Sequence, residues 1–389
     1  MTLVEEIAGL DEATLRPIVE KLVAVPVRDL EWTATPVDYK LANPVSAGLF
    51  RFAGTARAGA TDRPWSAVLK VLQTISDEDA ARFRIAADVR LHEAFRWDRE
   101  ACAYESGLFG DSSSGFRAAR WLGSRRGAHR CWVWLEDLGR DDERWDVSRY
   151  ALAARHLGRF NGEWLAGRPL PQEDWLSRGW LRTWLEIGLA SHAHEVIDDD
   201  AVWSEPIVRA EVDGDLRGRL RGAWARRSEL LEALDRVPLT LCHLDSFRGN
   251  LFSTTKPSGD AETVAVDWSY VGIGPLGTDL SQLVIASIFY HGDDHDVRRL
   301  ESACLPSYLA GLRESGWRGS ASDVHTGYAL AGAVRFLFVL GVLRAAPSAE
   351  HRARAERWGG TPYETQLALN VKRTEHLLGL AEPFLRNGT

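Results

Sequence analysis

The chain has 389 residues, of which 45% are hydrophobic and 26% are charged, and its formal net charge is −8. This composition predicts a globular protein with one large core or two smaller ones and excludes wholesale disorder. The negative balance argues against a general nucleic-acid binder, which needs a basic face, and mildly favours neutral or cationic partners.

The cysteines and the apolar segments indicate the cellular setting. Four cysteines lie far apart without a C-x-x-C pair, which favours reduced thiols in a cytosol over a disulfide framework or a zinc site. The beginning, "MTLVEEIAGLDEATL", has early acids and no long apolar core, unlike a secretory signal. The apolar stretch 328–346 is interrupted by Arg335 and Arg344, so it predicts a buried helix and not a membrane span. We therefore expect a cytoplasmic protein without a membrane partner.

The first third of the chain reads as a small α+β unit. An amphipathic helix is predicted over 11–23 and a longer one over 89–109. Alternating, β-branched runs predict strands at 30–42, 49–56, 65–72, 116–123 and 130–138. Between the first two runs lies "NPVSAG", a turn of small residues whose backbone N–H groups could approach a phosphate.

Lys70 stands out in the strand "WSAVLKVLQ", because only five of the 47 basic residues are lysines. A lysine in an apolar strand, in a chain that otherwise uses arginine, indicates a need for a compact ammonium group. The alternative is a lysine that snorkels from an edge strand.

The remainder of the chain is chiefly helical. Helices are predicted over 148–167, 178–194, 217–237 and from about 278 onward. Short strands interrupt them near 241–252 and 262–268, where a β-hairpin is expected to carry a polar cluster. We predict an N-terminal lobe over 1–138, a hinge near 136–140 and a C-terminal lobe over 139–389.

The polar cluster follows the spacing H-x-D-x-x-x-x-N in "HLDSFRGN", with His243, Asp245 and Asn250. Further on, in "VAVDWSYVGIGPLGTDL", an apolar strand ends in Asp267, and Asp279 begins a helix. A strand that runs into a carboxylate can hold a metal ligand rigidly, although an aspartate that merely starts a turn has the same pattern.

These residues together fit phosphoryl transfer. That chemistry needs a carboxylate that accepts the proton of the attacking hydroxyl, oxygen ligands for Mg²⁺, and a cation on the phosphates. Asp245 would supply the first, Asn250 and Asp267 the second, and Lys70 the third. Glu100, on the helix after the Lys70 strand, is the expected partner of the lysine, and Glu105 faces another way.

The chain resembles the aminoglycoside phosphotransferase and choline kinase-like superfamily, relatives of the protein kinases. The resemblance covers residues 45–285 and rests on "VLKVL", "REACAYESGL", "WLEDLG", "HLDSFRGNLF" and "VDWSYVGIGPLGTDL". It implies a protein-kinase-like two-lobe α+β fold, with a small antiparallel-sheet lobe and a larger, mainly helical lobe. The activity it implies is a phosphotransferase with an alcohol group as acceptor, Mg²⁺ as cofactor, and ATP or GTP as donor.

The resemblance also implies a role for each matching position. Asp245 would be the catalytic base, and Lys70, paired with Glu100, would contact the α- and β-phosphates. Asn250 and Asp267 would bind Mg²⁺. Further cofactor contacts are implied at Ser46, Ala47, Gly48, Leu49, Glu136, Asp137 and Leu138, the first four over the phosphates and the last three through the backbone at the nucleobase. His243 and Asp279 would brace the catalytic loop.

The loop after Asp245 departs from the His-Pro-Gly-type sequence of many relatives. Here Arg248 would neutralise the γ-phosphate or receive an acidic group of the substrate, and a solvated arginine or an internal salt bridge is the alternative. Arg335 would likewise bind an anion or form a buried ion pair.

The acceptor is less well defined by the sequence. Trp175, Trp180 and Trp184 would stack on a ligand or pack in the core, and Asp293 and Asp294 would meet a cationic amine or cap a helix. We expect a small-molecule hydroxyl substrate, neutral or cationic, such as an amino sugar, an antibiotic or an amino alcohol. A kinase of Ser or Thr side chains in a natural-product precursor peptide and a non-catalytic nucleotide-binding scaffold are the alternatives.

Overall fold

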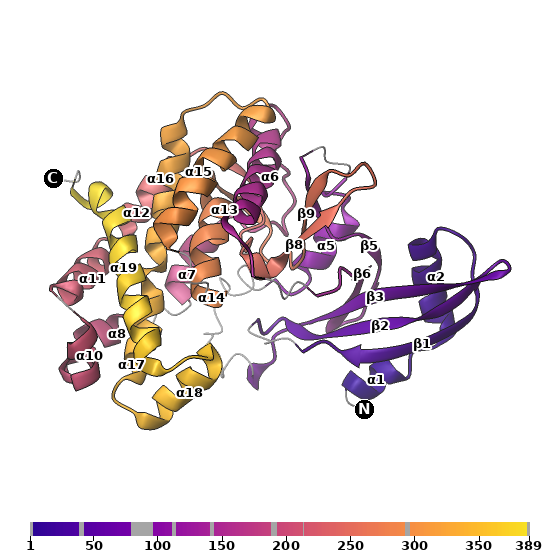
Figure 1. Ribbon diagram of the computed structural model, residues 1–389, viewed down its shortest axis with the longest axis horizontal. Helices are drawn as coiled ribbons and strands as arrows, with labels where there is room; N and C mark the ends of the chain where they lie inside the picture. The colour runs from indigo at the N-terminus through magenta and orange to yellow at the C-terminus, as the bar shows by residue number, and fades with distance from the viewer. Residues whose placement is uncertain are drawn as a thin grey trace. The chain divides into compact units, whose positions relative to one another are not determined.

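The computed structural model of the chain describes residues 3–38, 43–78, 96–110, 114–140, 144–187, 193–212, 214–291 and 296–386 (Figure 1). The strands are β1 (Arg28–Pro36), β2 (Ser46–Ala58), β3 (Thr61–Gln73), β4 (Phe116–Ala118), β5 (Trp121–Arg126), β6 (Arg130–Glu136), β7 (Leu239–Cys242), β8 (Leu251–Thr255), β9 (Ala261–Ala265) and β10 (Gly272–Pro275). The helices are α1 (Leu3–Ala8), α2 (Glu12–Val23), α5 (Arg99–Glu105), α6 (Val147–Leu165), α7 (Trp180–Ile187), α8 (Ala193–Asp198), α9 (Asp200–Ser204), α10 (Pro206–Glu211), α11 (Leu216–Ala225), α12 (Arg227–Leu234), α13 (Thr278–Ser281), α14 (Ser287–His291), α15 (Val297–Glu314), α16 (Ala321–Ala333), α17 (Phe338–Ala345), α18 (Ala349–Gly359) and α19 (Tyr363–Arg386).

The chain divides into two compact units. The first unit consists of Met1–Asp111, Arg117–Asp142 and Val264–Ser269, and the second of Ser112–Phe116, Glu143–Thr263 and Tyr270–Thr389. The first unit holds a five-stranded antiparallel sheet, and the rest of the chain is mainly helical. The predicted α+β class is therefore confirmed, whereas the lobe boundary after residue 138 stays a prediction.

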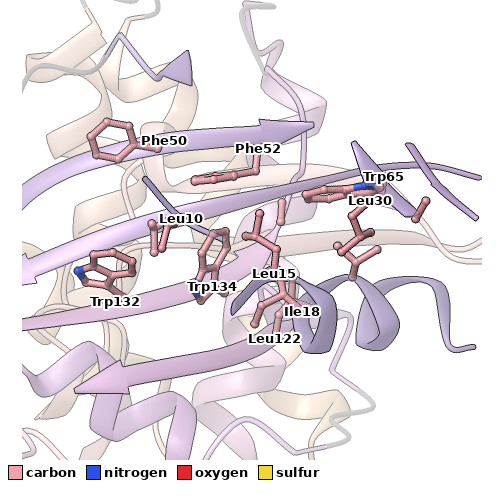
Figure 2. Packing of buried hydrophobic residues seen from close by; sticks show 14 of the residues in the cluster. Leu10, Leu15, Ile18, Leu30, Phe50, Phe52, Trp65, Leu122, Trp132 and Trp134 are labelled. Carbon is pink, nitrogen blue, oxygen red and sulfur yellow. The ribbon is translucent and has the colours of Figure 1, made fainter. Parts of the chain in front are cut away.

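The sheet of the first unit has the order β1-β2-β3-β6-β5, and α1 and α2 cover one of its faces. Figure 2 shows Leu15 and Ile18 of α2 directed toward Phe52 and Trp134, whose rings meet edge to face with centroids 4.8 Å apart. Side chains alternate along a strand, so Leu69 and Val71 of β3 join this core and Lys70 points to the other face of the sheet.

The helix predicted over 89–109 differs in the structure. In the described residues it is the short α5, which begins after Asp98 and ends at Glu105, and residues 79–95 lie outside the described part of the chain. Gly107 follows with a φ of +72°, a left-handed conformation in which glycine commonly ends a helix.

In the second unit, α6 packs against α15 through glycines. A Cβ on Gly158 of α6 would lie 2.2 Å from the carbonyl oxygen of Tyr308, and a Cβ on Gly311 of α15 would lie 2.0 Å from that of Arg155. The two backbones therefore approach more closely than any side chain there would allow. In Figure 1, α6 is magenta and α15 orange.

The strands beside the polar cluster belong to different sheets. β7 pairs with β10, and β8 lies next to β9 in the order β4-β9-β8. The predicted hairpin is present and is formed by β8 and β9 around the loop 256–260. The polar cluster lies immediately before β8, in the connection from one sheet to the other.

The apolar stretch 328–346 is helical and largely buried, as predicted, but it is not one helix. It ends α16, passes through a 3₁₀ turn at Val334–Leu337 and continues in α17. Across the described part of the chain, no helix combines the length and apolarity needed to cross a membrane.

Candidate active site

Lys70 is buried in the first unit between two carboxylates. Its strand, β3, is central in the sheet, and the residue is 3% exposed. Nζ lies 2.6 Å from Oε2 of Glu100 and 2.7 Å from Oδ1 of Asp267. A lysine that snorkels from an edge strand is therefore excluded, and the predicted pairing with Glu100 is present.

Glu100 is itself 1% exposed. Its burial raises the pKa of the carboxyl group above the usual range, the Lys70 ammonium opposes that rise, and the negative charge of Asp267 adds to it. Glu105 lies elsewhere, paired with Arg126 at 2.8 Å. The choice of Glu100 over Glu105 as the partner of the lysine is thus confirmed by the contacts.

Asp267 follows β9 in a left-handed conformation with a φ of +58°, which is costly for a residue with a side chain. Its Oδ1 accepts a hydrogen bond from Oγ of Ser269 at 2.5 Å, and that hydroxyl also lies 3.4 Å from Oε2 of Glu100. The carbonyl of Ser269 accepts a hydrogen bond of 2.8 Å from the buried Arg99. The sequence analysis did not single out Ser269. Its position two residues after Asp267 could have indicated a role beside that carboxylate.

The end of β6 and the residues after it are held in place by their own acidic side chains. The Glu136 carboxylate accepts the backbone N–H of Arg120 at 2.7 Å and also pairs with Arg117. Asp137 pairs with Arg51 at 2.8 Å, and it accepts the N–H of Gly139 at 3.0 Å. These contacts fix the segment that leads to Leu138. A contact between this backbone and a nucleobase stays a prediction.

The small residues predicted to form a turn lie in a strand. Ser46, Ala47 and Gly48 open β2 ahead of Leu49, which was expected in the strand, and β2 is bulged between Ser46 and Gly48. The turn lies before them, at 43–45, because the strand and its alternation of buried and half-buried side chains begin at Ser46 and not at Leu49. Their contact with phosphates stays a prediction.

Asp279 braces the polar loop of the second unit. The residue is fully buried, and its carboxylate accepts the backbone N–H groups of His243 at 3.0 Å and of Leu244 at 2.8 Å. It also accepts a hydrogen bond of 3.1 Å from the Asn161 amide. Leu244 has a φ of +64°, so the anchored N–H groups hold a strained turn immediately before Asp245.

Asp245 and Asn250 lie together, as their predicted roles require. The Asn250 amide donates to the Asp245 carbonyl oxygen at 2.9 Å and to its Oδ2 at 3.1 Å. The backbone N–H of Asp245 donates to Nδ1 of His243 at 3.2 Å. That imidazole nitrogen is therefore an acceptor, and the histidine supports the loop through it.

The neighbouring Arg248 is held through its backbone, whose N–H donates to Oγ of Ser287 at 2.8 Å.

The support that Asp279 gives to the polar loop extends to a residue that the sequence did not indicate. Asn161 of α6 orients its amide toward Asp279 and accepts a hydrogen bond of 2.7 Å from the Tyr308 hydroxyl. Asn161 and Asp279 are 118 positions apart, so no local pattern connects them.

The structure describes only some of the tryptophans and aspartates that were considered as contacts to the acceptor. Trp175 and Trp180 are each 8% exposed, and α7 begins only at Trp180, so Trp175 precedes the helix. The side chain of Trp184, and Asp293 and Asp294 altogether, lie outside the described residues.

The residues expected to bind Mg²⁺ offer a carboxylate (Asp267) and an amide oxygen (Asn250). This oxygen set suits a hard cation that draws its other ligands from phosphates and water. Within the described ranges, no group of three or more His, Cys, Asp or Glu side chains is arranged to hold a metal by itself. Binding of Mg²⁺ by Asp267 and Asn250 stays a prediction.

Comparison with family models and with curated proteins finds no match for this chain. Among solved structures it is similar to an amicoumacin kinase in complex with AMP-PNP and Ca²⁺, with 15% identity, 96% of each chain covered and a TM-score of 0.47. It is also similar to an aminoglycoside phosphotransferase from Alicyclobacillus acidocaldarius, with 13% identity, 92% of each chain covered and a TM-score of 0.46. A choline kinase from Cryptosporidium parvum matches at 11% identity over 92% of this chain and 91% of that one, with a TM-score of 0.46.

Proposed function

We propose that the chain is a Mg²⁺-dependent O-phosphotransferase that transfers the γ-phosphoryl group of ATP or GTP to a hydroxyl of a small molecule. The observation that carries the proposal is the burial of Lys70 between Glu100 and Asp267. Well-packed apolar residues usually replace a buried ion pair at little or no cost in stability. Three ionisable groups kept together beside the sheet, on the face opposite its hydrophobic core, therefore favour work on a charged ligand.

Each residue has a part in the proposed reaction. Lys70, oriented by Glu100, would bind the phosphates, and Asp267 and Asn250 would hold the Mg²⁺ that neutralises phosphate charge when it is bound. Asp245 would orient the acceptor hydroxyl and take its proton. Ser269 would position Asp267, and Asp279 would position the loop that carries Asp245.

The decisive experiment measures phosphate transfer from Mg-ATP and Mg-GTP to a panel of aminoglycosides, amino sugars, amino alcohols, hydroxy acids and Ser-rich peptides. We expect Asp245→Asn to lower turnover by roughly 10²–10⁴-fold, the usual contribution of a general base, and to spare nucleotide binding. The matched control is Asp146→Asn, at the exposed N-terminus of α6, where asparagine also caps a helix. Wild-type turnover in Asp245→Asn would show that the base is assigned wrongly.

The metal assignment is tested by nucleotide binding in calorimetry with and without Mg²⁺. We expect Mg²⁺ to tighten binding in the wild type and to have little effect in Asp267→Ala, because the carboxylate is the charged ligand of the proposed site. An affinity that does not respond to Mg²⁺ in the wild type would reject the assignment.

A further inference from the structure

An ion pair spans three strands in the sheet of the first unit. Arg51 of β2 donates through Nε to Oδ2 of Asp137 at 2.8 Å and through Nη2 to Oδ1 at 3.0 Å. Nη2 also donates to the carbonyl oxygen of Gly139 at 3.2 Å. Asp137 is the first residue after β6, so the pair joins β2 to the end of β6. Its two parallel hydrogen bonds give the guanidinium a fixed orientation.

The strand register places this pair on the sheet face that carries Lys70. Arg51 is opposite Val68 of β3, and Val68 is opposite Leu135 of β6. Directly paired residues point to the same face of a sheet, and side chains alternate along each strand. Arg51 and Asp137 therefore share the face of Lys70. Because they are two strand spacings apart, about 9.6 Å, the arginine side chain must pass across β3.

This face becomes more open from Lys70 toward Val68. Lys70 is 3% exposed and Leu72, on its other side, is fully buried, whereas Val68 and Ser66 are half-buried. The Arg51 side chain is 30% exposed. A ligand whose phosphates lie at Lys70 therefore has space for its remaining part toward Val68 and not toward Leu72. Two strand residues span about 6.6 Å, which is comparable to the ribose that joins a base to its phosphates.

The chemistry of the ion pair suits a base better than a phosphate. The Asp137 carboxylate compensates the charge of Arg51, so the pair as a whole attracts a phosphate weakly. Hydrogen bonds lie in the plane of a guanidinium, so the bonds to Asp137 and Gly139 use its edge and leave its faces for stacking on a ring. A planar cation over an aromatic ring adds a cation–π attraction.

We propose that Arg51, oriented by Asp137, stacks on the nucleobase of the donor nucleotide and sets a preference for purines over pyrimidines. The proposal rests on the proposed phosphotransferase function and adds a specificity-determining residue to its nucleotide site. A purine ring covers more of the guanidinium than a pyrimidine ring does. Stacking uses the face of the base and not its hydrogen-bonding edge, so adenine and guanine nucleotides gain the same contact.

The test measures the affinities of ADP, GDP, CDP, UDP and inorganic pyrophosphate by calorimetry in the presence of Mg²⁺. In the wild type we expect the purine nucleotides to bind about tenfold more tightly than the pyrimidine ones, since the larger ring stacks better. We expect Arg51→Ala to weaken ADP and GDP binding roughly 5- to 30-fold, the size of one stacking or cation–π contact. CDP and UDP should lose less, and pyrophosphate should bind as before.

Two further variants make the result specific. Arg51→Lys keeps the positive charge without the planar group, so it should resemble Arg51→Ala. The matched control is Arg57→Ala, on the same face of β2 and about 20 Å along the strand, where the arginine pairs with Asp62 at 3.2 Å. We expect this control to keep the wild-type affinity for all five ligands. Thermal unfolding verifies that each variant is folded.

The outcomes separate this inference from the proposed function. An equal loss for pyrophosphate and the nucleotides would show that Arg51 contacts phosphate, and full recovery in Arg51→Lys would show that its charge decides. Either result overturns the inference, as does a purine preference that Arg51→Ala leaves unchanged, and the phosphotransferase then still stands. A wild type with neither Mg²⁺-dependent nucleotide binding nor phosphate transfer would reject the proposed function itself.

Discussion

At the scale of single residues, two left-handed backbone positions are stabilised by buried polar groups. Leu244 and Asp267 have φ values of +64° and +58°, and conformations of this kind persist only where the surroundings over-determine them. The Asp279 carboxylate anchors the first through its N–H, and Ser269 and Lys70 hold the side chain of the second. Both positions adjoin or carry a proposed functional carboxylate, which is where such strain tends to occur.

A pH-dependent prediction also belongs to this scale. His156 is 3% exposed, and its Nδ1 lies 3.0 Å from Oγ1 of Thr263. Burial, with Arg159 and Arg155 adding to it, lowers the pKa of His156 to about 4. Because the folded pKa lies below that of the unfolded chain, the stability from the neutral ring is complete above about pH 6.5 and is lost as pH falls through about 4.

Urea unfolding between pH 7 and pH 4.5 tests this effect. We expect the wild type to lose more unfolding free energy than His156→Gln, by roughly 1.4 kcal/mol for each pH unit below 6.5. The comparison with His156→Gln controls for all other titrating groups, because the variant leaves them unchanged. Parallel pH dependence in the two proteins would contradict the prediction.

At the scale of elements, the pairing of α6 with α15 depends on missing side chains. Gly158 and Gly311 allow backbone contact, and this contact places Asn161 of α6 and Tyr308 of α15 within hydrogen-bond distance of each other. The helix pair therefore helps to position Asp279 and, through it, the loop of Asp245.

We predict that Gly311→Ala destabilises the protein by about 1–3 kcal/mol, the usual cost of overpacking a tight contact. The matched control is Gly379→Ala in α19, where a Cβ would meet nothing within 4 Å. That change should stabilise by about 0.5–1 kcal/mol, because alanine favours a helix over glycine. Thermal and urea unfolding measure both, and equal effects in the two variants would show that helix propensity, not packing, decides.

At the scale of the whole molecule, each compact unit combines segments that are distant in sequence. The first unit takes in Val264–Ser269, more than 120 residues after its other segments, and this segment delivers Asp267 to Lys70. The second unit holds the Asp245 loop together with its anchor Asp279. The proposed chemistry therefore depends on long-range assembly within each unit.

The four cysteines report on this assembly. All are free thiols, three of them buried and Cys102 half-buried. Burial raises the pKa of Cys102, and it raises that of Cys131 to about 11 and that of Cys304 to about 12. We expect a thiol reagent at pH 8 to label Cys102 alone, and slowly, in the native protein and all four cysteines in urea. Rapid native labelling of a second thiol would show that a unit opens locally.

Much of the fold was predictable because it depends on local periodicity. The strands of the sheet, α2 and α6 follow from alternating or helical patterns with recognisable caps, such as Asp11 before α2 and Asp146 before α6. Pairing between distant strands was not predictable, because it is not encoded in either strand. β7 pairs with β10, which begins 30 positions after β7 ends.

The candidate site likewise has parts that the sequence determines and parts that it does not. The sequence by itself determined the spacing of His243, Asp245 and Asn250 and the strand that ends at Asp267, because these are patterns of neighbours. Only the tertiary structure decided that Ser269 joins Lys70 and Glu100, that Asn161 supports Asp279, and that Tyr308 supports Asn161 in turn. The physical reason is that a buried polar group needs partners, and which distant residue becomes the partner is settled only when helices and strands pack.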